Sequence, residues 1–183
     1  MVTIPVDETL LLRTFEPSDA ADLFDAIDSS RQHLHPWLNW VSKTTKPEHS
    51  LSFIEQSHQQ LNNQEGLALA IVLNNKIIGG MGMHKWEPDI KRAQIGYWIT
   101  APYEGRGIIS KALNKFIAYL FEQLPLNKIE IHFVAANKRS AGVAAKLGFT
   151  IEGVIRQSFV RNGITEDLVV LGLLKSEWKI QAS

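Results

Sequence analysis

The sequence contains no cysteine among its 183 residues. This absence excludes disulfides, metal sites built from thiolates, and any reaction through a covalent cysteine intermediate. An acyl transfer, if one takes place, must therefore be direct or use an oxygen nucleophile. The six histidines are scattered, and the close pair His33 and His35 does not have a common metal-ligand spacing. We therefore expect no metal site.

The sequence also lacks a long apolar run and an excess of charge. No stretch of 18 apolar residues is present, and the first eight residues do not resemble a signal peptide. Basic and acidic side chains number 19 each, so nothing favours a nucleic acid or an anionic membrane as partner. We expect a soluble, cytoplasmic protein whose residues 1–183 form a single domain.

The apolar pattern predicts a mixed α/β fold in the order β-α-α-β-β-β-α-β-α-β-β, with an antiparallel centre to the sheet. Helices are expected to begin at Pro17 and Pro47, after Gly107 and at Asn137, and the aromatic segment 33–41 is expected to be a loop. Strands are expected over residues 9–15, 67–73, 77–86, 92–99 and 128–134, followed by two strands that flank Arg161-Asn-Gly163.

The most informative segment is 95–110, where a strand ends and Gly105 and Gly107 precede a helix. Glycine lets the backbone approach a ligand closely, and the first N–H groups of a helix have no partner within it. Such a turn binds phosphate or diphosphate well. The third expected helix then carries apolar residues at spacings of three and four, namely Ile109, Leu113, Phe116, Ile117 and Leu120.

This glycine turn has three other interpretations. A nucleotide-binding P-loop needs Gly-Lys-Ser/Thr, but Ile108 follows Gly107, so that motif is excluded. A dinucleotide-binding motif needs Gly or Ala where Ser110 stands, and an acidic residue at the tip of the next strand. That strand ends Phe133-Val-Ala-Ala136 without an acid, so this motif is not favoured. A plain tight turn without a ligand stays open on the glycines alone.

Together with Asn137-Lys-Arg-Ser-Ala-Gly-Val-Ala-Ala-Lys-Leu-Gly-Phe149, this segment resembles the GNAT superfamily of acetyl-CoA-dependent N-acetyltransferases. Within it, the chain is most similar to the RimJ/RimL type, which acetylates α-amino groups of ribosomal proteins. The subgroup features are residues 12–20, the Trp37/Trp40 segment, Glu87-Pro88, residues 95–98 and Ile151-Glu-Gly153. The resemblance covers roughly residues 9 to 175 and implies the GNAT fold, with acetyl-CoA as co-substrate.

The resemblance also implies a set of cofactor contacts. The diphosphate-binding loop of the family falls on Glu104-Gly-Arg-Gly-Ile-Ile109, where Glu104 and Ile109 depart from the usual Gln/Arg and Gly/Ala. Glu104 is unfavourable near a phosphate unless it points to solvent or to Arg106, and Arg106 and Lys111 could compensate its charge. The strands ending at Ile99 and near Val134 are expected to splay around the pantetheine arm. The implied cofactor-binding residues are Trp98, Ile99, Arg106, Gly107, Ile108, Ile109, Ser110, Asn137 and Lys146.

Candidate catalytic groups follow from the resemblance and from the expected hairpin. Ser140 matches the position proposed to protonate the leaving sulfur, although it could instead cap the fourth helix, and Asn137 could be a pantetheine contact or that cap. Glu87 and His84 are candidates for the general base, His132 could be ordinary sheet packing, and a water relay is a further alternative.

The walls of the acceptor site are expected to come from Trp37, Trp40, Trp86 and Tyr97, which could also be core residues. The acceptor is expected to be a protein N-terminus or a small amine, a non-catalytic acetyl-CoA sensor is the rival class, and a homo-oligomer is possible.

Overall fold

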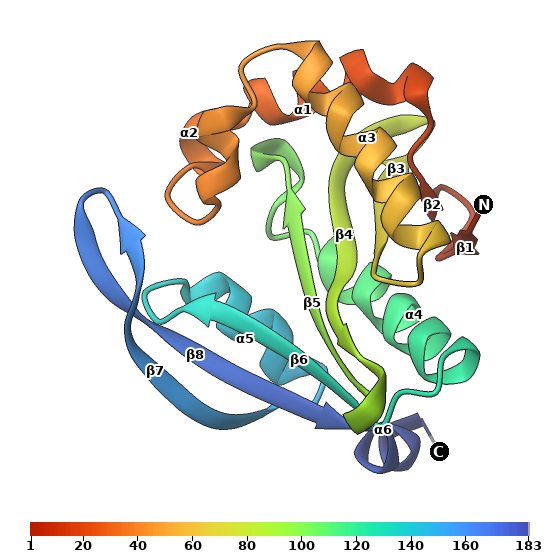
Figure 1. Cartoon of the computed structure of the whole chain (residues 1–183), viewed down its shortest axis with the longest axis vertical. Coiled ribbons are helices and arrows are strands. Elements are labelled where there is room, and N and C mark those ends of the chain that lie inside the picture. The colour runs from red at the N-terminus through yellow and green to blue at the C-terminus, as the bar shows by residue number, and fades with distance from the viewer. Residues whose placement is uncertain (183) are drawn as a thin grey trace.

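The computed structural model describes residues 1–182 and contains one eight-stranded sheet, in the order β1-β2-β3-β4-β5-β6-β8-β7 (Figure 1). Neighbouring strands are antiparallel except β5 and β6, which are parallel. This matches the mixed sheet with an antiparallel centre predicted from the sequence. The strands are β1 (Thr3–Pro5), β2 (Leu10–Thr14), β3 (Leu67–Leu73), β4 (Lys76–Glu87), β5 (Arg92–Ile99), β6 (Lys128–Val134), β7 (Thr150–Arg161) and β8 (Ile164–Leu174).

Helices cover both faces of the sheet. They are α1 (Ala20–Asp28), α2 (Arg31–Leu34), α3 (Pro47–Asn62), α4 (Ile108–Gln123), α5 (Lys138–Lys146) and α6 (Lys175–Ala182). Residues of β3 alternate between two apolar cores: Leu69 and Ile71 pack with α4 and α5, whereas Ala70 and Val72 pack with α1, α2 and α3. A strand buried on both faces needs a continuous apolar run, and β3 has one.

The α4 face predicted from its three- and four-residue spacing is confirmed. All five predicted residues are buried, together with Ala112 and Phe121. Burial of a large apolar side chain contributes roughly 1.5–3 kcal/mol, so this face fixes α4 firmly under the sheet. The N-terminus of α4 is thereby held beside the end of β5.

Two predicted hairpins are also confirmed by their backbone geometry. The turn between β3 and β4 consists of Asn74 and Asn75, and the turn between β7 and β8 consists of Asn162 and Gly163; all four residues have positive φ. Positive φ at both central positions is typical of the tight turns that match the twist of an antiparallel pair.

The structure adds elements that the sequence pattern did not predict. Strand β1, helix α2 and helix α6 are new, and the segment 33–41, expected to be a loop, contains the end of α2 and the start of a 3-10 helix, Asn39–Lys43. These elements are short, or lie at the chain ends, so their apolar periodicity is weak.

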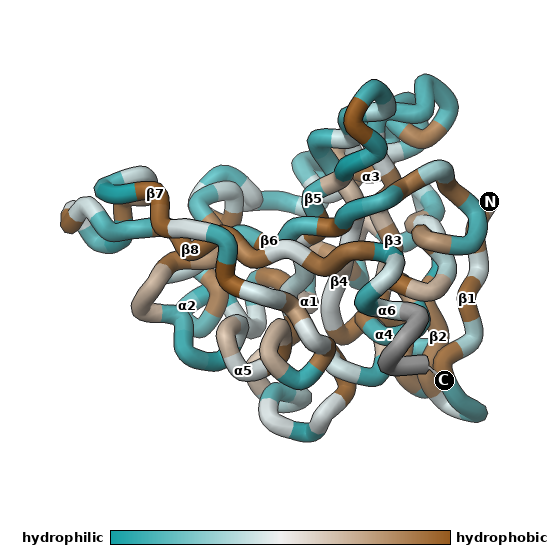
Figure 2. Tube along the Cα trace, turned by 90° about the horizontal axis from the view of Figure 1, so that it is seen from below, coloured by the Kyte–Doolittle hydropathy of each residue, from teal (hydrophilic) through white to brown (hydrophobic). Residues whose placement is uncertain are grey.

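Strand β7 forms one edge of the sheet, and its long hairpin with β8 projects at one side of the molecule (Figures 1 and 2). Its exposed large apolar side chains are Ile151, Val154, Ile155 and Val160. None of the helices formed by residues 1–182 combines the length and apolar character needed to cross a membrane.

Candidate active site

The site is organised around a gap between β5 and β6. These strands pair from Arg92 opposite Lys128 to Ile95 opposite Ile131, and no pairing continues beyond that point. Each strand keeps its other neighbour, because β5 pairs with β4 up to Ile99 and β6 pairs with β8 up to Val134. The two strand ends therefore diverge, as the sequence resemblance implied.

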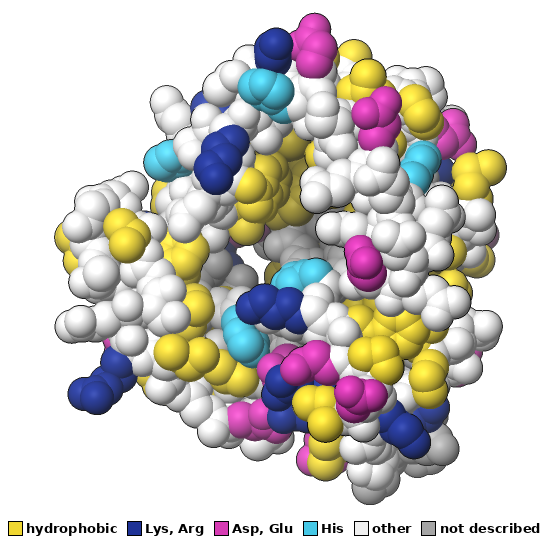
Figure 3. All heavy atoms as spheres, viewed as in Figure 1, with side chains coloured by type: hydrophobic (Ala, Val, Ile, Leu, Met, Phe, Trp, Pro, Cys, Tyr) yellow, Lys and Arg dark blue, Asp and Glu magenta, His cyan; other side chains and the backbone are white. Residues whose placement is uncertain are grey.

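A cavity of about 670 Å³ occupies this gap and extends to both sides of the sheet. On one side it is lined by the starts of α4 and α5, and on the other by His33, Leu34, Trp37, His84 and Gln94. Figure 3 shows a hollow near the middle of the molecule, with histidine, cationic and apolar side chains around its rim. A long, thin ligand can thus reach from one face of the sheet to the other.

The turn before α4 is open and shaped for an anion. Gly105 and Gly107 have φ values of 74° and 75°, and a Cβ on either would meet no atom within 4 Å. The first helical hydrogen bond is donated by the Lys111 N–H to the Gly107 carbonyl, so the N–H groups of residues 108–110 have no acceptor within the helix. Together with the positive end of the helix dipole, they make this turn suited to hold a phosphate.

The charge of Glu104 is compensated, but not by the residues expected. The Glu104 carboxylate lies 2.9 Å from an Arg139 nitrogen on α5 and 3.7 Å from Nε2 of His33. The expectation that Arg106 compensates it is wrong, because the Arg106 guanidinium lies over the Tyr103 ring, 5.4 Å from its centroid. The Lys111 ammonium lies 3.7 Å from the Asp7 carboxylate rather than beside Glu104.

Most of the expected cofactor-binding residues line the cavity. They are Trp98, Ile99, Gly107, Ile108, Ile109, Ser110, Asn137 and Lys146, while Arg106 does not line it. The Thr100 N–H donates to the Ile78 carbonyl of β4, and the N–H and C=O groups of successive residues in a strand point to opposite sides. The N–H and C=O of Trp98, two residues before Thr100, therefore also point toward β4. It follows that Tyr97 and Ile99 turn their backbone groups toward the gap, whereas Trp98 does not.

The start of α5 places Ser140 in the cavity. The Asn137 side chain accepts a hydrogen bond from the Ser140 N–H at 3.1 Å, so Asn137 is the N-cap, and the alternative that Ser140 caps this helix is wrong. The Tyr97 hydroxyl donates to the Ser140 carbonyl at 3.4 Å. Burial raises the pKa of Tyr97 to about 12, so Tyr97 is neutral at physiological pH.

The two base candidates are separated in space. His84 lines the cavity, and burial, followed by the neighbouring charges of Lys85 and His132, lowers its pKa. Glu87 does not line this cavity; its carboxylate accepts hydrogen bonds from the Arg92 guanidinium at 2.6 and 2.8 Å. The structure therefore does not bring Glu87 into the cavity that His84 and Ser140 line; Glu87 instead lines a neighbouring cavity together with His132.

Two of the four residues expected to form the walls of the acceptor site line the cavity, and two do not. Trp37 and Tyr97 line the cavity, whereas Trp40 and Trp86 do not. Trp40 is 38% exposed and packs edge-on against Trp98, and Trp86 packs against the apolar core beside α4. Sequence reasoning missed Arg161, whose guanidinium lies 5.2 Å from the Trp37 ring centroid and connects the β7–β8 hairpin to this wall.

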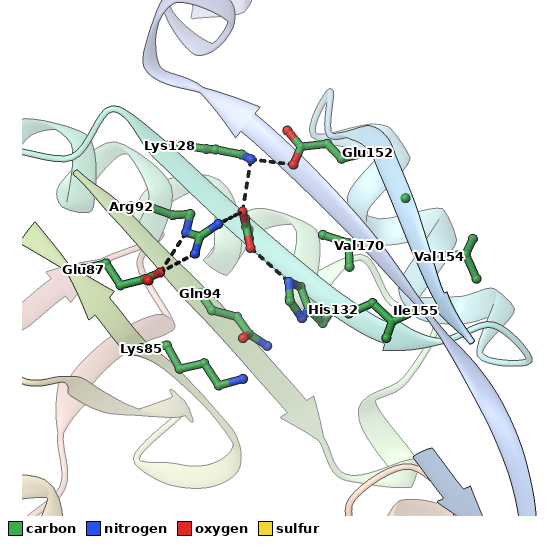
Figure 4. A pocket seen from close by; sticks show the side chains of 12 residues that line it. Lys85, Glu87, Arg92, Gln94, Lys128, His132, Glu152, Val154, Ile155 and Val170 are labelled. Atoms are coloured by element: carbon green, nitrogen blue, oxygen red, sulfur yellow. Dashed lines mark hydrogen bonds and ion pairs between the residues drawn. The ribbon is translucent and has the colours of Figure 1, made fainter. Parts of the chain in front are cut away.

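A second group that sequence reasoning missed is a polar network beside the gap (Figure 4). Its centre is the buried residue Glu130, whose carboxylate contacts Arg92, Lys128 and His132. The signal in the sequence was the alternation of Glu130 and His132 opposite Ile129, Ile131 and Phe133, which put both polar side chains on one face of β6. Across residues 1–182 there is no cluster of three or more residues with side chains suited to hold a metal ion.

Comparison with known proteins finds acetyltransferases. Residues 9–150 match the family model described as "Acetyltransferase (GNAT) domain". The chain is 33% identical over 180 residues to the "Putative ribosomal N-acetyltransferase YdaF" of Bacillus subtilis (strain 168), covering 98% of each chain. It is 28% identical over 168 residues to the "Ribosomal-protein-serine acetyltransferase" of Escherichia coli (strain K12), covering 91% of this chain and 93% of the relative.

A solved structure is similar over most of its length. It is the microcin C7 self-immunity acetyltransferase MccE in complex with acetyl-CoA and AMP, at a TM-score of 0.88 and 28% identity, covering 92% of this chain and 94% of the other. The mixed sheet, the diverging strands and the glycine turn agree with the family match. The chain belongs to the GNAT acetyltransferase family and is an acetyl-CoA-dependent N-acetyltransferase.

Proposed function

We propose that this enzyme transfers the acetyl group of acetyl-CoA to the N-terminal α-amino group of a protein, with a ribosomal protein as the favoured acceptor. The observation that carries the proposal is the cavity that passes through the sheet from the glycine turn of α4 to the side lined by Trp37. It provides separate approaches for the donor and the acceptor. The names of the two sequence relatives support the ribosomal acceptor.

In this proposal the donor enters from the side of α4 and α5. The diphosphate binds the N–H groups of residues 108–110, and Arg139 and Lys146 on α5 offer positive charge to the other phosphate. The pantetheine arm lies in the gap between β5 and β6, where the backbone groups of Tyr97 and Ile99 are free of a strand partner. The thioester then lies beside Ser140.

The acceptor amine approaches from the opposite side and must be neutral to attack. At pH 7.5 an α-amino group is roughly a quarter to two-fifths neutral, but a lysine side chain only about 0.1%. As the amine attacks the thioester carbon, a backbone N–H facing the gap stabilises the developing oxyanion. The nitrogen gives up one proton to a base, the C–S bond breaks, and the thiolate takes a proton from the Ser140 hydroxyl, which regains one from water.

A small amine is the second candidate acceptor. The observation in its favour is the likeness to MccE, whose structure is of a complex with acetyl-CoA and AMP, which is a small molecule. Both candidates use the same donor side of the cavity, and they differ only in what binds near Trp37 and Arg161.

Turnover measured on two acceptor panels distinguishes these candidates. One panel holds peptides with the N-terminal sequences of ribosomal proteins, and the other holds polyamines, aminoglycosides and aminoacyl nucleotides. We expect acetylation of a subset of the peptides, located on the α-amino group by mass spectrometry. Activity on small amines alone would reject the ribosomal acceptor, and acetyl-CoA binding without acetylation of any amine would favour the sensor.

A further inference from the structure

Glu130 and His132 lie next to each other on the face of β6 that points away from α4 and α5. Nε2 of His132 is 3.0 Å from Oε2 of Glu130, and both side chains are largely buried, at 18% and 8% exposed. Their strand neighbours Ile129 and Ile131 point the other way, into the core beneath α4. The pair therefore faces the side of the sheet from which the acceptor approaches.

The network around Glu130 keeps its carboxyl group ionised. Burial by itself raises the pKa of Glu130, but hydrogen bonds from Lys128 and His132 and the charges of Lys128 and Arg92 outweigh it, so the pKa lies below its usual range. Oε1 lies 3.0 Å from the Lys128 ammonium and 3.1 Å from the Arg92 guanidinium, and Oε2 is left for His132. Figure 4 shows this arrangement.

An ionised carboxylate fixes the tautomer of the imidazole. Oε2 can only accept, so Nε2 of His132 carries a hydrogen and donates a hydrogen bond to Glu130. Nδ1 of a neutral imidazole is then an acceptor, free to take a proton. The carboxylate also stabilises the imidazolium that forms when it does.

His132 is placed where a base is needed. It is the first residue of β6 beyond Ile131, the last residue that pairs with β5, so it lies at the point where the strands begin to diverge. Its side chain lines the cavity together with Gly96, Tyr97 and Ser140. His132 and Gln94 also line a second cavity of about 730 Å³, which offers a proton a path to solvent.

We propose that His132 is the general base of acetyl transfer, taking a proton from the acceptor nitrogen, and that Glu130 is its positioning residue. The inference deepens the proposed function and rests on it. The nitrogen forms its bond to the acetyl carbon and gives one proton to Nδ1 of His132. The C–S bond breaks as the thiolate is protonated through Ser140, and His132 releases its proton to water.

The other charged or titratable groups near His132 are less suitable. His84 on β4 has no carboxylate partner, and its surroundings lower its pKa, so it accepts a proton poorly. Lys85 on β4 is a cation, and Arg92 on β5 and Lys128 on β6 are held by Glu130. Glu152 on β7 is paired with Lys128.

The first test is steady-state kinetics of His132→Gln on the best peptide acceptor, with His49→Gln as the matched control. His49 is an exposed residue of α3 outside the cavity. We expect kcat of H132Q to fall about 10²- to 10³-fold, in the range of a lost general base, with an unchanged KM for acetyl-CoA. His132→Asn makes the same test with a shorter side chain if H132Q does not fold.

Two readouts distinguish a base from a structural residue. Free imidazole should restore part of the activity of His132→Gly. In Glu130→Gln, kcat should fall while acetyl-CoA binding and the KM for acetyl-CoA are kept, because the imidazole loses the carboxylate that fixes its orientation. Wild-type kcat in folded H132Q, or no rescue by imidazole, would overturn the proposal while leaving the proposed function intact. A wild-type enzyme that acetylates no amine would overturn both.

Discussion

Ser140 contributes to the structure through its backbone N–H, whereas its proposed role in proton transfer belongs to its hydroxyl. The two roles can therefore be tested separately. The Ser140 N–H is the group that Asn137 caps, and alanine would keep this N–H. For Ser140→Ala we therefore expect an unchanged melting temperature and a kcat reduced by about 10²-fold, the usual scale for a positioned proton donor. Thermal denaturation and steady-state rates check this together. An unaltered rate would remove Ser140 from the protonation of the leaving sulfur.

Glu104 is the second residue whose contacts give a prediction. It departs from the family pattern and is held by Arg139 at 2.9 Å and by His33 at 3.7 Å. Replacing it with glutamine removes a negative charge beside the phosphate site and releases Arg139 for a phosphate. Since a charge pair near 4 Å is worth about 1 kcal/mol in water, CoA should bind E104Q up to about five-fold more tightly at low salt.

Calorimetry of CoA binding at low and high ionic strength measures this effect. The gain should shrink at high salt, because exposed charges are screened. Weaker binding by E104Q at both salt concentrations would contradict the prediction, and would mean that Glu104 holds the mouth of the cavity in shape.

At the level of elements, the start of α4 depends on two left-handed glycines. Gly107→Ala should destabilise the protein by about 1–2 kcal/mol, because a Cβ is unfavourable at positive φ. Gly163 is a matched control: its φ is 79°, and an added Cβ meets no atom within 4 Å, as at Gly107. We expect both variants to lose similar stability in urea unfolding, but only G107A to lose CoA affinity, by tenfold or more. Equal CoA affinities in the two variants would contradict a ligand contact at Gly107.

Elements with a strong apolar period or a strong turn were predictable from the sequence. The buried face of α4, the apolar run of β3 and the Asn-Asn and Asn-Gly hairpins follow local rules, and all are present. Helix α2 spans four residues, too few to show a period, and β1 spans three. The site was predictable only where family motifs lie, at the glycine turn and the start of α5.

The remaining site residues depend on contacts between distant parts of the chain. Arg161 reaches Trp37 across 124 positions, and Arg139 meets Glu104 because α5 lies beside the α4 turn. Such pairs carry no local pattern in the sequence. Glu87 lies outside the cavity for a different, local reason, because Arg92, which holds its carboxylate, lies directly across the β4–β5 turn.

At the scale of the whole molecule, His84 makes stability depend on pH. Its pKa is lowered in the folded protein, mainly by burial, so the unfolded chain binds the proton more readily. The contribution of His84 to the free energy of unfolding is therefore fully present above the ordinary histidine pKa of about 6.5. This contribution is lost as the pH falls below that value. We expect the free energy of unfolding to fall between pH 7 and pH 5, and to fall less in His84→Gln. The same pH slope in both proteins would exclude His84 as its source.

The proposed acetyl transfer requires the main-chain N–H groups at the start of α4 to hold the diphosphate of CoA. Isothermal titration calorimetry with CoA and with pantetheine, which lacks the diphosphate, tests this most directly. We expect CoA to bind and pantetheine to bind at least about 100-fold more weakly, because each charge-assisted hydrogen bond to the diphosphate is worth about 1.5–3 kcal/mol. Equal affinities for the two ligands, or no heat from CoA with folded protein, would contradict it.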